Sequence, residues 1–312
     1  MPTGEQFTLD FSGPSGHATA TIVQLAASLR EYRIDDVDVV EPYRPDEQTP
    51  YGSGTVLVPW PNRVANGRWT LDGEPQQLEI TEPAFNNALH GLLMMTLYQA
   101  IERSSNAVTL AATVHPQAGY PFLLETTVRY ELLDDGLTVT HTIRNLSTRS
   151  APVAVGAHPY LRIGDVPTDD LVLRVSAGSR FEADEQFIPT AELPFAGLNG
   201  VPLRELVLND AFGGVPFADG IAVHSITAPD GRRVELWQDE SFGYVQVYTC
   251  RVFPSAGALR FAVAIEPMTA PPNALATGQG LRWLEPSEVW ELRWGIRPVF
   301  VGAGRARKGD GA

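Results

Sequence analysis

A carboxylate that follows a strand of small and large apolar residues is the first candidate for chemistry. Residues 261–266 read Phe-Ala-Val-Ala-Ile-Glu, and a proline follows them. With the period of two of a β-strand, the large side chains share one face, whereas Ala262, Ala264 and Glu266 share the other. A carboxylate is rarely buried without a partner, and the two alanines leave space beside it. The pattern indicates a functional carboxylate or, alternatively, a structural Glu paired with an Arg or a turn amide.

Two of the six histidines stand out, and one of them, His158, repeats the setting of Glu266. His158 ends the apolar run Val-Ala-Val-Gly-Ala-His at residues 153–158, and Pro159 stops that strand. His90 lies in Asn-Asn-Ala-Leu-His-Gly, a turn sequence. Two strands that end in this way could place Glu266 and His158 at one rim or concave face of a sheet; the alternative is two unrelated strand ends. The remaining histidines fit surface loops, a strand and an apolar strand face: His17, His115, His224 and His141.

A fourth candidate segment is the run Pro-Trp-Pro-Asn-Arg at residues 59–63. The prolines on both sides of Trp60 hold the chain extended and fix the pair Asn62 and Arg63 after it. Arg63 offers a rigid fork of donors and Trp60 a flat apolar surface, which together suit a sugar. The alternative is a surface loop with an Arg–carboxylate pair.

Several other kinds of site are not indicated. The sequence has no Gly-x-Ser-x-Gly elbow, no phosphate-binding loop and no paired cysteines for zinc. His90, His158 and Glu266 could imitate a two-His, one-carboxylate iron site, but they lack a local signature. We therefore expect no metal.

Composition and charge narrow the class of protein. The chain has 312 residues, 44% of them hydrophobic, and a net charge of -14. That charge disfavours nucleic acid and anionic membranes as partners. The single cysteine, Cys250, cannot form an internal disulfide, and its apolar surroundings indicate a buried, inert thiol. No signal peptide or membrane-spanning run is visible, so we expect a soluble, cytoplasmic protein.

The elements that must position these residues read as β-strands. Residues 123–146 alternate in polarity around Asp-Asp-Gly and predict a hairpin, and residues 290–297 alternate in the same way. Residues 234–237 and 244–248 predict another hairpin, and residues 20–33 favour strand over helix. We expect an all-β, large antiparallel β-sandwich with few short helices, as one domain over residues 1–302, followed by a disordered tail at 303–312.

The order of these motifs resembles the aldose 1-epimerases (galactose mutarotases), in the branch with Pro-Trp-Pro-Asn-Arg. The resemblance covers residues 18–298 and rests on five further runs in the family order. They are Leu-Asp-Gly at 71–73, Leu-His-Gly at 89–91, His-Pro-Tyr at 158–160, Ala-Ile-Glu-Pro-Met-Thr-Ala-Pro-Pro-Asn-Ala at 264–274 and Leu-Glu-Pro-Ser-Glu at 284–288.

The resemblance implies a β-sandwich enzyme that interconverts the α and β anomers of a free aldohexose, a monosaccharide, without a cofactor. Glu266 is then the catalytic base and His158 the catalytic acid. The implied substrate-binding residues are Arg63, Asn62, His90, Asn209, Gln246, Trp60 and Tyr160. The family usually has a sugar-binding Asp where the best register here places Asn209 rather than Asp210, so hydroxyl preference is open. Cys250 and Ser287 replace glycines that are common in the family.

Two alternatives remain from the sequence. One is a hexose-6-phosphate 1-epimerase, which would want a cationic cluster beyond Arg63 and Arg68. The other is a non-catalytic carbohydrate-binding or sugar-sensing protein on the same fold. The sequence leaves the preferred sugar and anomer open, and monomer and homodimer are both compatible with it.

Overall fold

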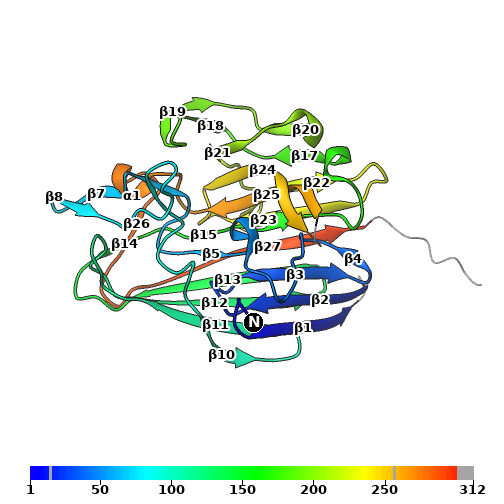
Figure 1. Ribbon diagram of the computed structural model, residues 1–312, viewed down its shortest axis with the longest axis horizontal. Coiled ribbons are helices and arrows are strands. Elements are labelled where there is room, and N and C mark those ends of the chain that lie inside the picture. The colour runs from blue at the N-terminus through cyan, green and yellow to red at the C-terminus, as the bar shows by residue number, and fades with distance from the viewer. Residues whose placement is uncertain (14–15, 256–257, 301–312) are drawn as a thin grey trace, which may run out of the picture.

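The fold is built almost entirely from antiparallel β-sheet (Figure 1). The computed structural model describes residues 1–13, 16–255 and 258–300. Within these ranges a nine-stranded and an eight-stranded sheet carry most of the chain, and a four-stranded and three two-stranded sheets complete it. The predicted all-β sandwich with few short helices is confirmed. The expected tail at 303–312 lies outside the described residues.

The strands of the two large sheets do not follow one another in chain order. In spatial order, the nine-stranded sheet contains β10 (Gln99–Arg103), β11 (Ala107–Val114), β12 (Leu124–Leu133), β13 (Gly136–Asn145), β27 (Val289–Val299), β23 (Arg233–Asp239), β22 (Ile221–Thr227), β17 (Val172–Val175) and β20 (Leu198–Pro202). The eight-stranded sheet contains β19 (Pro189–Pro194), β18 (Ser179–Ala183), β21 (Asn209–Gly213), β24 (Tyr244–Ser255), β25 (Ala258–Met268), β15 (Gly156–Ala157) and β5 (Val56–Leu57), with β16 (Tyr160–Leu161) also paired to β25.

Within the described ranges, four smaller sheets and a few short helices complete the fold. The four-stranded sheet contains β1 (Gln6–Gly13), β2 (Gly16–Val23), β3 (Leu29–Ile34) and β4 (Val37–Asp38). The two-stranded sheets are β6 (Arg63–Ala65) with β9 (Asn87–Leu89), β7 (Arg68–Leu71) with β8 (Glu74–Gln77), and β14 (Ala151–Val153) with β26 (Arg282–Leu284). The described helices are α1 (Ala274–Thr277) and the 3-10 turns η1 (Pro50–Gly52), η2 (Thr168–Asp170) and η3 (Leu203–Glu205).

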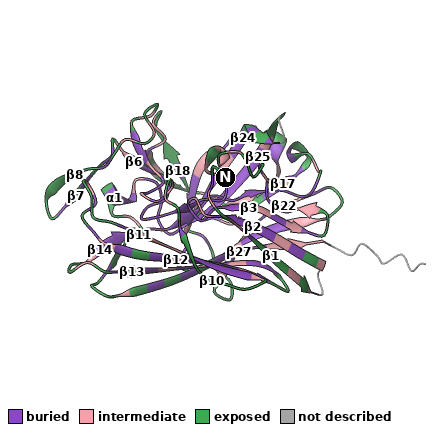
Figure 2. Cartoon of the chain, turned by 60° about the horizontal axis from the view of Figure 1, so that its bottom comes forward, coloured by how far each residue is buried: buried purple, intermediate pink, exposed green. Residues whose placement is uncertain are grey.

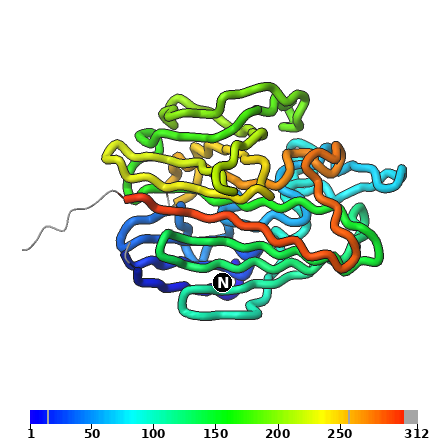
Figure 3. The backbone as a smooth tube through the Cα atoms, turned by 180° about the vertical axis from the view of Figure 1, so that it is seen from behind, coloured from blue at the N-terminus to red at the C-terminus, as the bar shows by residue number. Residues whose placement is uncertain are grey.

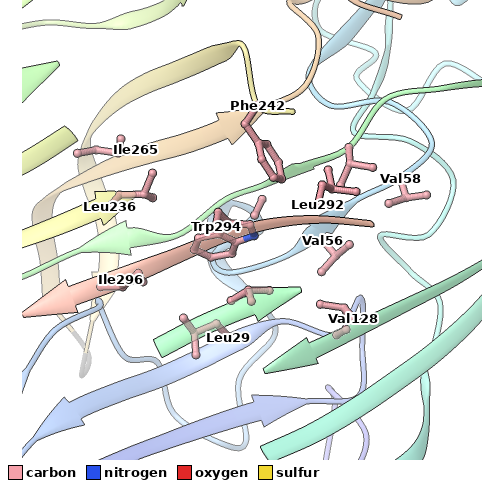
Figure 4. Close-up of a cluster of buried hydrophobic side chains, with 14 of the residues drawn as sticks. Leu29, Val56, Val58, Val128, Leu236, Phe242, Ile265, Leu292, Trp294 and Ile296 are labelled. Carbon is pink, nitrogen blue, oxygen red and sulfur yellow. The ribbon is translucent and has the colours of Figure 1, made fainter. Parts of the chain in front are cut away.

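The main core lies between the two large sheets. Leu292, Trp294 and Ile296 of β27 pack in one buried cluster with Val56 of β5 and Ile265 of β25 (Figure 4). Burial alternates along β27 because every second side chain of a strand points to the same face. Figure 2 shows buried positions alternating with intermediate or exposed ones along β12 and β13. The period-two patterns in the sequence therefore mark the sheet faces correctly.

One predicted hairpin is confirmed and another is wrong. β12 and β13 pair with Leu133 opposite Gly136, as the Asp-Asp-Gly turn predicts. β23 and β24 are consecutive in sequence, yet β23 pairs with β22 and β27, whereas β24 pairs with β21 and β25. Figure 3 shows β27, in red, between β13 and β23. The segment between β23 and β24 therefore crosses from one large sheet to the other.

Other local features agree with the predictions from the sequence. Residues 20–33 contain the end of β2 and most of β3, so the preference for strand over helix is confirmed. Cys250 is buried. His141 is interior and accepts a hydrogen bond from Trp294 Nε1 at 2.9 Å. Among the described residues, no helix has the length and apolar character needed to cross a bilayer.

Candidate active site

Glu266 and His158 meet on the eight-stranded sheet. β15 pairs with β25 at Gly156 opposite Met268, and β16 pairs with it at Tyr160 opposite Ala264. His158 lies in the interruption between β15 and β16, which places it opposite Glu266. Its Nε2 is 3.4 Å from Glu266 Oε1, and both side chains are buried. The predicted meeting of the two strand segments is therefore observed, although β25 continues through Pro267 to Met268 instead of ending at Glu266.

Burial sets the protonation of this pair. It raises the pKa of Glu266 to about 8, and the positive charge of Arg63 partly opposes that rise. Burial lowers the pKa of His158 to about 4; a hydrogen bond to its own backbone raises it and Arg63 lowers it further. Both shifts have the same cause, since a charge loses hydration when it is buried.

His90 and Asn62 form a rigid corner beside the pair. The backbone N–H of Asn62 donates to His90 Nδ1 at 3.2 Å, and the N–H of His90 donates to the carbonyl of Asn62 at 2.8 Å. Both residues have left-handed backbone angles, with φ of 54° and 61°. Burial lowers the pKa of His90 well below its ordinary value, and His158 and Arg63 add to this shift. Because Nδ1 accepts the hydrogen bond from Asn62, a neutral His90 carries its proton on Nε2.

Arg63 is held on two sides. Its Nε and one terminal nitrogen donate to the two carboxylate oxygens of Glu82, each at 2.8 Å. Its guanidinium also lies over the ring of Phe187, 4.8 Å from the centroid. This two-point contact fixes the plane of the guanidinium. The other terminal nitrogen, Nη1, makes only a 3.5 Å contact with Asn62 Oδ1. The Arg–carboxylate pair considered from the sequence therefore exists, but it lies at the candidate site.

The Pro-Pro-Asn part of the Glu266 segment holds the Arg63 segment in place. The side-chain oxygen of Asn273 accepts from the N–H of Ala65 at 3.0 Å, and the N–H of Asn273 donates to the carbonyl of Arg63 at 2.6 Å. Asn273 has φ of 68°, a left-handed conformation that Asn tolerates better than most residues. Two motifs far apart in the sequence are thus joined directly through the backbone.

Asn209 and Gln246 lie on neighbouring strands next to the pair. Gln246 is directly opposite Glu266 in the pairing of β24 with β25. Its Nε2 donates to Asn209 Oδ1 at 2.9 Å, and its buried Oε1 has no partner among the described residues. Asp210 instead accepts from Arg180 at 2.8 and 3.1 Å. Asn209, rather than Asp210, is therefore tied to the residues around Glu266.

Two expectations about aromatic residues are contradicted. Trp60 is 2% exposed and packs in the main core, with its ring 6.2 Å from that of Tyr120, so it offers no stacking surface to a ligand. Tyr160 is buried behind His158 and does not line the cavity. Both rings are apolar over most of their surface, so burial stabilises them. Trp60 is buried in the main core and Tyr160 in the small cluster beside β25.

The alanines of β25 leave space that another protein side chain occupies. Ala262 and Ala264 are fully buried and pack with Tyr160, Cys250 and Phe253 in a small apolar cluster. The space that the alanines leave is therefore filled by the ring of Tyr160 rather than by a ligand. Val263 and Ile265, on the opposite face, belong to the main core, so the assignment of faces itself is confirmed.

A cavity of about 870 Å³ opens over Glu266 and His158. Six of the predicted site residues line it: Asn62, Arg63, His90, His158, Asn209 and Glu266. Gln246 lines a small recess shared with Asn62, Arg63 and Asn209. Among the described residues, no group of three or more His, Cys, Asp or Glu side chains is arranged to hold a metal ion.

Other residues that line this cavity were not predicted from the sequence. Glu82, Arg180, Asp184, Phe187 and Tyr51 all face this cavity. Glu82 and Phe187 lie in irregular loops, so no strand period singles them out. Tyr51 and Phe187 have φ of 46° and 60°, which is unusual for aromatic residues and appears only in the structure.

Comparisons with known proteins cover nearly the whole chain. A family model described as Aldose 1-epimerase matches residues 13–297. The chain is 33% identical over 286 residues to the Uncharacterized protein YihR of Escherichia coli, across 90% of this chain and 91% of that protein. It is 29% identical over 197 residues to the Galactose mutarotase of Bos taurus, across 60% of this chain and 56% of that protein.

Solved structures share the fold at lower identity. A GalM/aldose epimerase homologue from C. elegans has a TM-score of 0.83 at 17% identity, across 96% of this chain and all (100%) of that one. A putative aldose 1-epimerase from Escherichia coli has a TM-score of 0.78 at 19% identity, across 95% and 100% of the two chains. These similarities extend over both large sheets.

Proposed function

Because this chain belongs to the aldose 1-epimerase family, we propose that it interconverts the α and β anomers of a free aldohexose. The observation that carries the proposal is the 3.4 Å approach of His158 Nε2 to Glu266 Oε1 on the floor of a large cavity. Arg63, His90 and Asn209 surround this pair with hydrogen-bonding groups that match sugar hydroxyls. A simple binding site has no need of a buried acid–base pair.

The proposed reaction requires two proton transfers at one anomeric centre. The carboxylate of Glu266 takes the proton of the O1 hydroxyl while His158 gives a proton to the ring oxygen, and the C1–O5 bond breaks. The open-chain aldehyde then rotates about C1–C2. Ring closure on the other face returns both protons and gives the other anomer. General acid–base catalysis of this kind contributes roughly 10²–10⁴-fold for each group.

The pair needs one proton in total for this reaction. With pKa values of about 8 for Glu266 and about 4 for His158, the free site holds that proton on Glu266 between these limits. The reactive form differs only by transfer of the proton to His158 across the 3.4 Å contact. A hydroxyl that donates to Glu266 stabilises its carboxylate, so substrate binding favours this transfer.

The direct test is polarimetry with freshly dissolved α-D-glucose and α-D-galactose. Purified protein is expected to speed the approach to the equilibrium rotation above the spontaneous rate, in proportion to enzyme concentration. A heat-inactivated sample controls for buffer catalysis. No acceleration with any free aldose would contradict the proposed function and favour a carbohydrate-binding protein.

The pH dependence of the rate follows from the shared proton. Below about 4 both groups are protonated and the base is lost; above about 8 both are deprotonated and the acid is lost. We expect a bell-shaped profile of kcat/KM with its maximum between these limits, whose two apparent pKa values belong to the pair. A rate that keeps rising above about pH 9 would contradict a catalytic role for the proton on the pair.

Asn209 is expected to influence which hydroxyl arrangement is accepted. In Asn209→Asp, Gln246 can still donate to the side chain, but the amide N–H donors are replaced by an acceptor. One changed hydrogen bond corresponds to a shift of roughly 3- to 10-fold in the ratio of kcat/KM for galactose and glucose. Steady-state kinetics on both sugars measure that ratio. If Asp210 binds the sugar hydroxyl instead, Asp210→Asn changes the ratio of kcat/KM for the two sugars and Asn209→Asp does not.

The charges of the cavity favour an unphosphorylated sugar over a hexose 6-phosphate. Of the described lining residues, two are arginines and four are carboxylates, and each arginine is already paired, Arg63 with Glu82 and Arg180 with Asp210. Arg68, the other arginine that the sequence offers for a phosphate site, hydrogen-bonds to Gln77 on the exposed hairpin of β7 and β8.

The cytoplasmic location and the oligomeric state stay predictions from the sequence.

A further inference from the structure

The imidazole of His158 is held in an unusual way. Catalytic histidines are commonly oriented by a hydrogen bond from the ring nitrogen that does not react. Here Nε2 faces Glu266, and the buried Nδ1 makes no hydrogen bond to any other described residue; its one polar contact is with the backbone of His158 itself. The orientation of the ring must therefore be set by packing.

Two aromatic rings provide that packing. The ring of Tyr160 is stacked on the imidazole, with centroids 5.2 Å apart and planes at 23°. The ring of His90 meets it edge-on, with centroids 5.5 Å apart and planes at 76°. His90 lines the cavity and is hydrogen-bonded to Asn62, whereas Tyr160 does not line the cavity and supports the imidazole from the protein interior.

Tyr160 is itself fixed by its surroundings. It lies directly opposite Ala264 in the strand pairing, and Ala262 and Phe253 complete its seat, with the Phe253 ring centroid 4.7 Å away. Its hydroxyl donates to the carbonyl of Tyr51 at 3.4 Å. A larger side chain at position 262 or 264 would occupy the space that the ring now fills.

We propose that Tyr160 is a positioning residue for His158, and that Ala262 and Ala264 are small in order to seat its ring. The stacked ring holds Nε2 on the line to Glu266. Its electron-rich face also favours the imidazolium that forms when His158 takes up the proton. This inference rests on the proposed function for its kinetic consequence, but the packing can be tested separately.

The kinetic test compares Tyr160→Phe with Tyr160→Leu. Phe keeps the stacked ring and is expected to retain kcat within about 3-fold, whereas Leu removes the ring and is expected to lower kcat by roughly 10- to 100-fold with KM nearly unchanged. Tyr120→Leu is the matched control, because Tyr120 is equally buried and makes no ring contact with the pair. Near-normal kcat in Tyr160→Leu, or an equal loss in Tyr160→Phe and Tyr160→Leu, would overturn the proposal.

A second measurement does not depend on activity. A stacked tyrosine shifts the ring protons of a histidine upfield in the NMR spectrum, and His158→Asn identifies the resonance. We expect the upfield shift in the wild type and in Tyr160→Phe, and its loss in Tyr160→Leu and in Ala264→Val, whose added methyl groups displace the ring. A His158 shift that is the same in all four proteins would overturn the inference. If the wild type epimerises no aldose while the shift behaves as expected, the proposed function fails and the packing relationship stands.

Discussion

Glu266→Gln is expected to reduce the rate of anomer interconversion by roughly 10²–10⁴-fold while the protein stays folded. Gln has nearly the same shape as Glu but cannot accept the O1 proton. Because the side chain is 2% exposed, no water can easily replace the carboxylate. Polarimetry with glucose and galactose measures the loss, and circular dichroism checks the fold. Near-normal activity would contradict the assignment of Glu266 as the base.

The same variant is expected to be more stable than the wild type at alkaline pH. The folded-state pKa of Glu266 is about 8, above its ordinary value of 4.5, so the folded protein binds a proton that the unfolded chain has already lost. Wild-type stability therefore falls as the pH rises from about 4.5 through about 8, and Gln does not titrate. Thermal unfolding at about pH 4.5 and about pH 9 should show the difference only at the higher pH. Glu182→Gln, on an exposed position of β18, is the matched control and should show neither effect.

Arg63→Met is expected to impair both stability and activity. It removes the cation from a largely buried ion pair and leaves Glu82 without its partner, which destabilises by roughly 3 kcal/mol. It also removes the charge that lowers the pKa of both Glu266 and His158, so both limbs of the pH profile should move to higher pH. Urea unfolding and the pH dependence of kcat/KM measure the two effects.

The double variant Arg63→Met/Glu82→Leu separates these effects. Replacing both members of the pair by apolar residues removes the unpaired carboxylate, so most of the lost stability should return. The activity should not return, because Arg63 is proposed to bind the substrate and lowers the pKa of Glu266, whereas Glu82 only holds Arg63 in place. Recovery of both stability and activity in the double variant would show that Arg63 has only a structural role.

The local patterns of the sequence were sufficient to predict which side chains share a face of each strand. Period-two alternation marked the buried faces of β12, β13 and β27, and in β25 it separated the residues of the main core from those of the small cluster around Tyr160. This succeeded because the direction of successive side chains in a strand is a local property of the backbone. The interruption at Pro159 was equally visible, and it is what places His158 beside β25.

Partners and burial were decided by the tertiary structure. The alternation of apolar and polar residues in β23 and β24 would be the same whether the two strands paired with each other or joined different sheets. The sequence therefore could not distinguish these cases, and the predicted hairpin was wrong. Trp60 was expected at a sugar and lies in the core, while Glu82, in an irregular loop, supplies the partner of Arg63. Strand pairing and burial depend on contacts between distant parts of the chain, which no local period encodes.

The Glu266 strand shows both contributions. The sequence alone determined that Ala262, Ala264 and Glu266 share a face and that the carboxylate on it needs a partner. The tertiary structure chose between the two alternatives for His158 and placed it beside Glu266, and only the structure showed that a tyrosine ring lies over the alanines. The physical reason is that small residues create space in any fold, whereas the group that fills this space comes from whichever distant segment the sheet brings alongside.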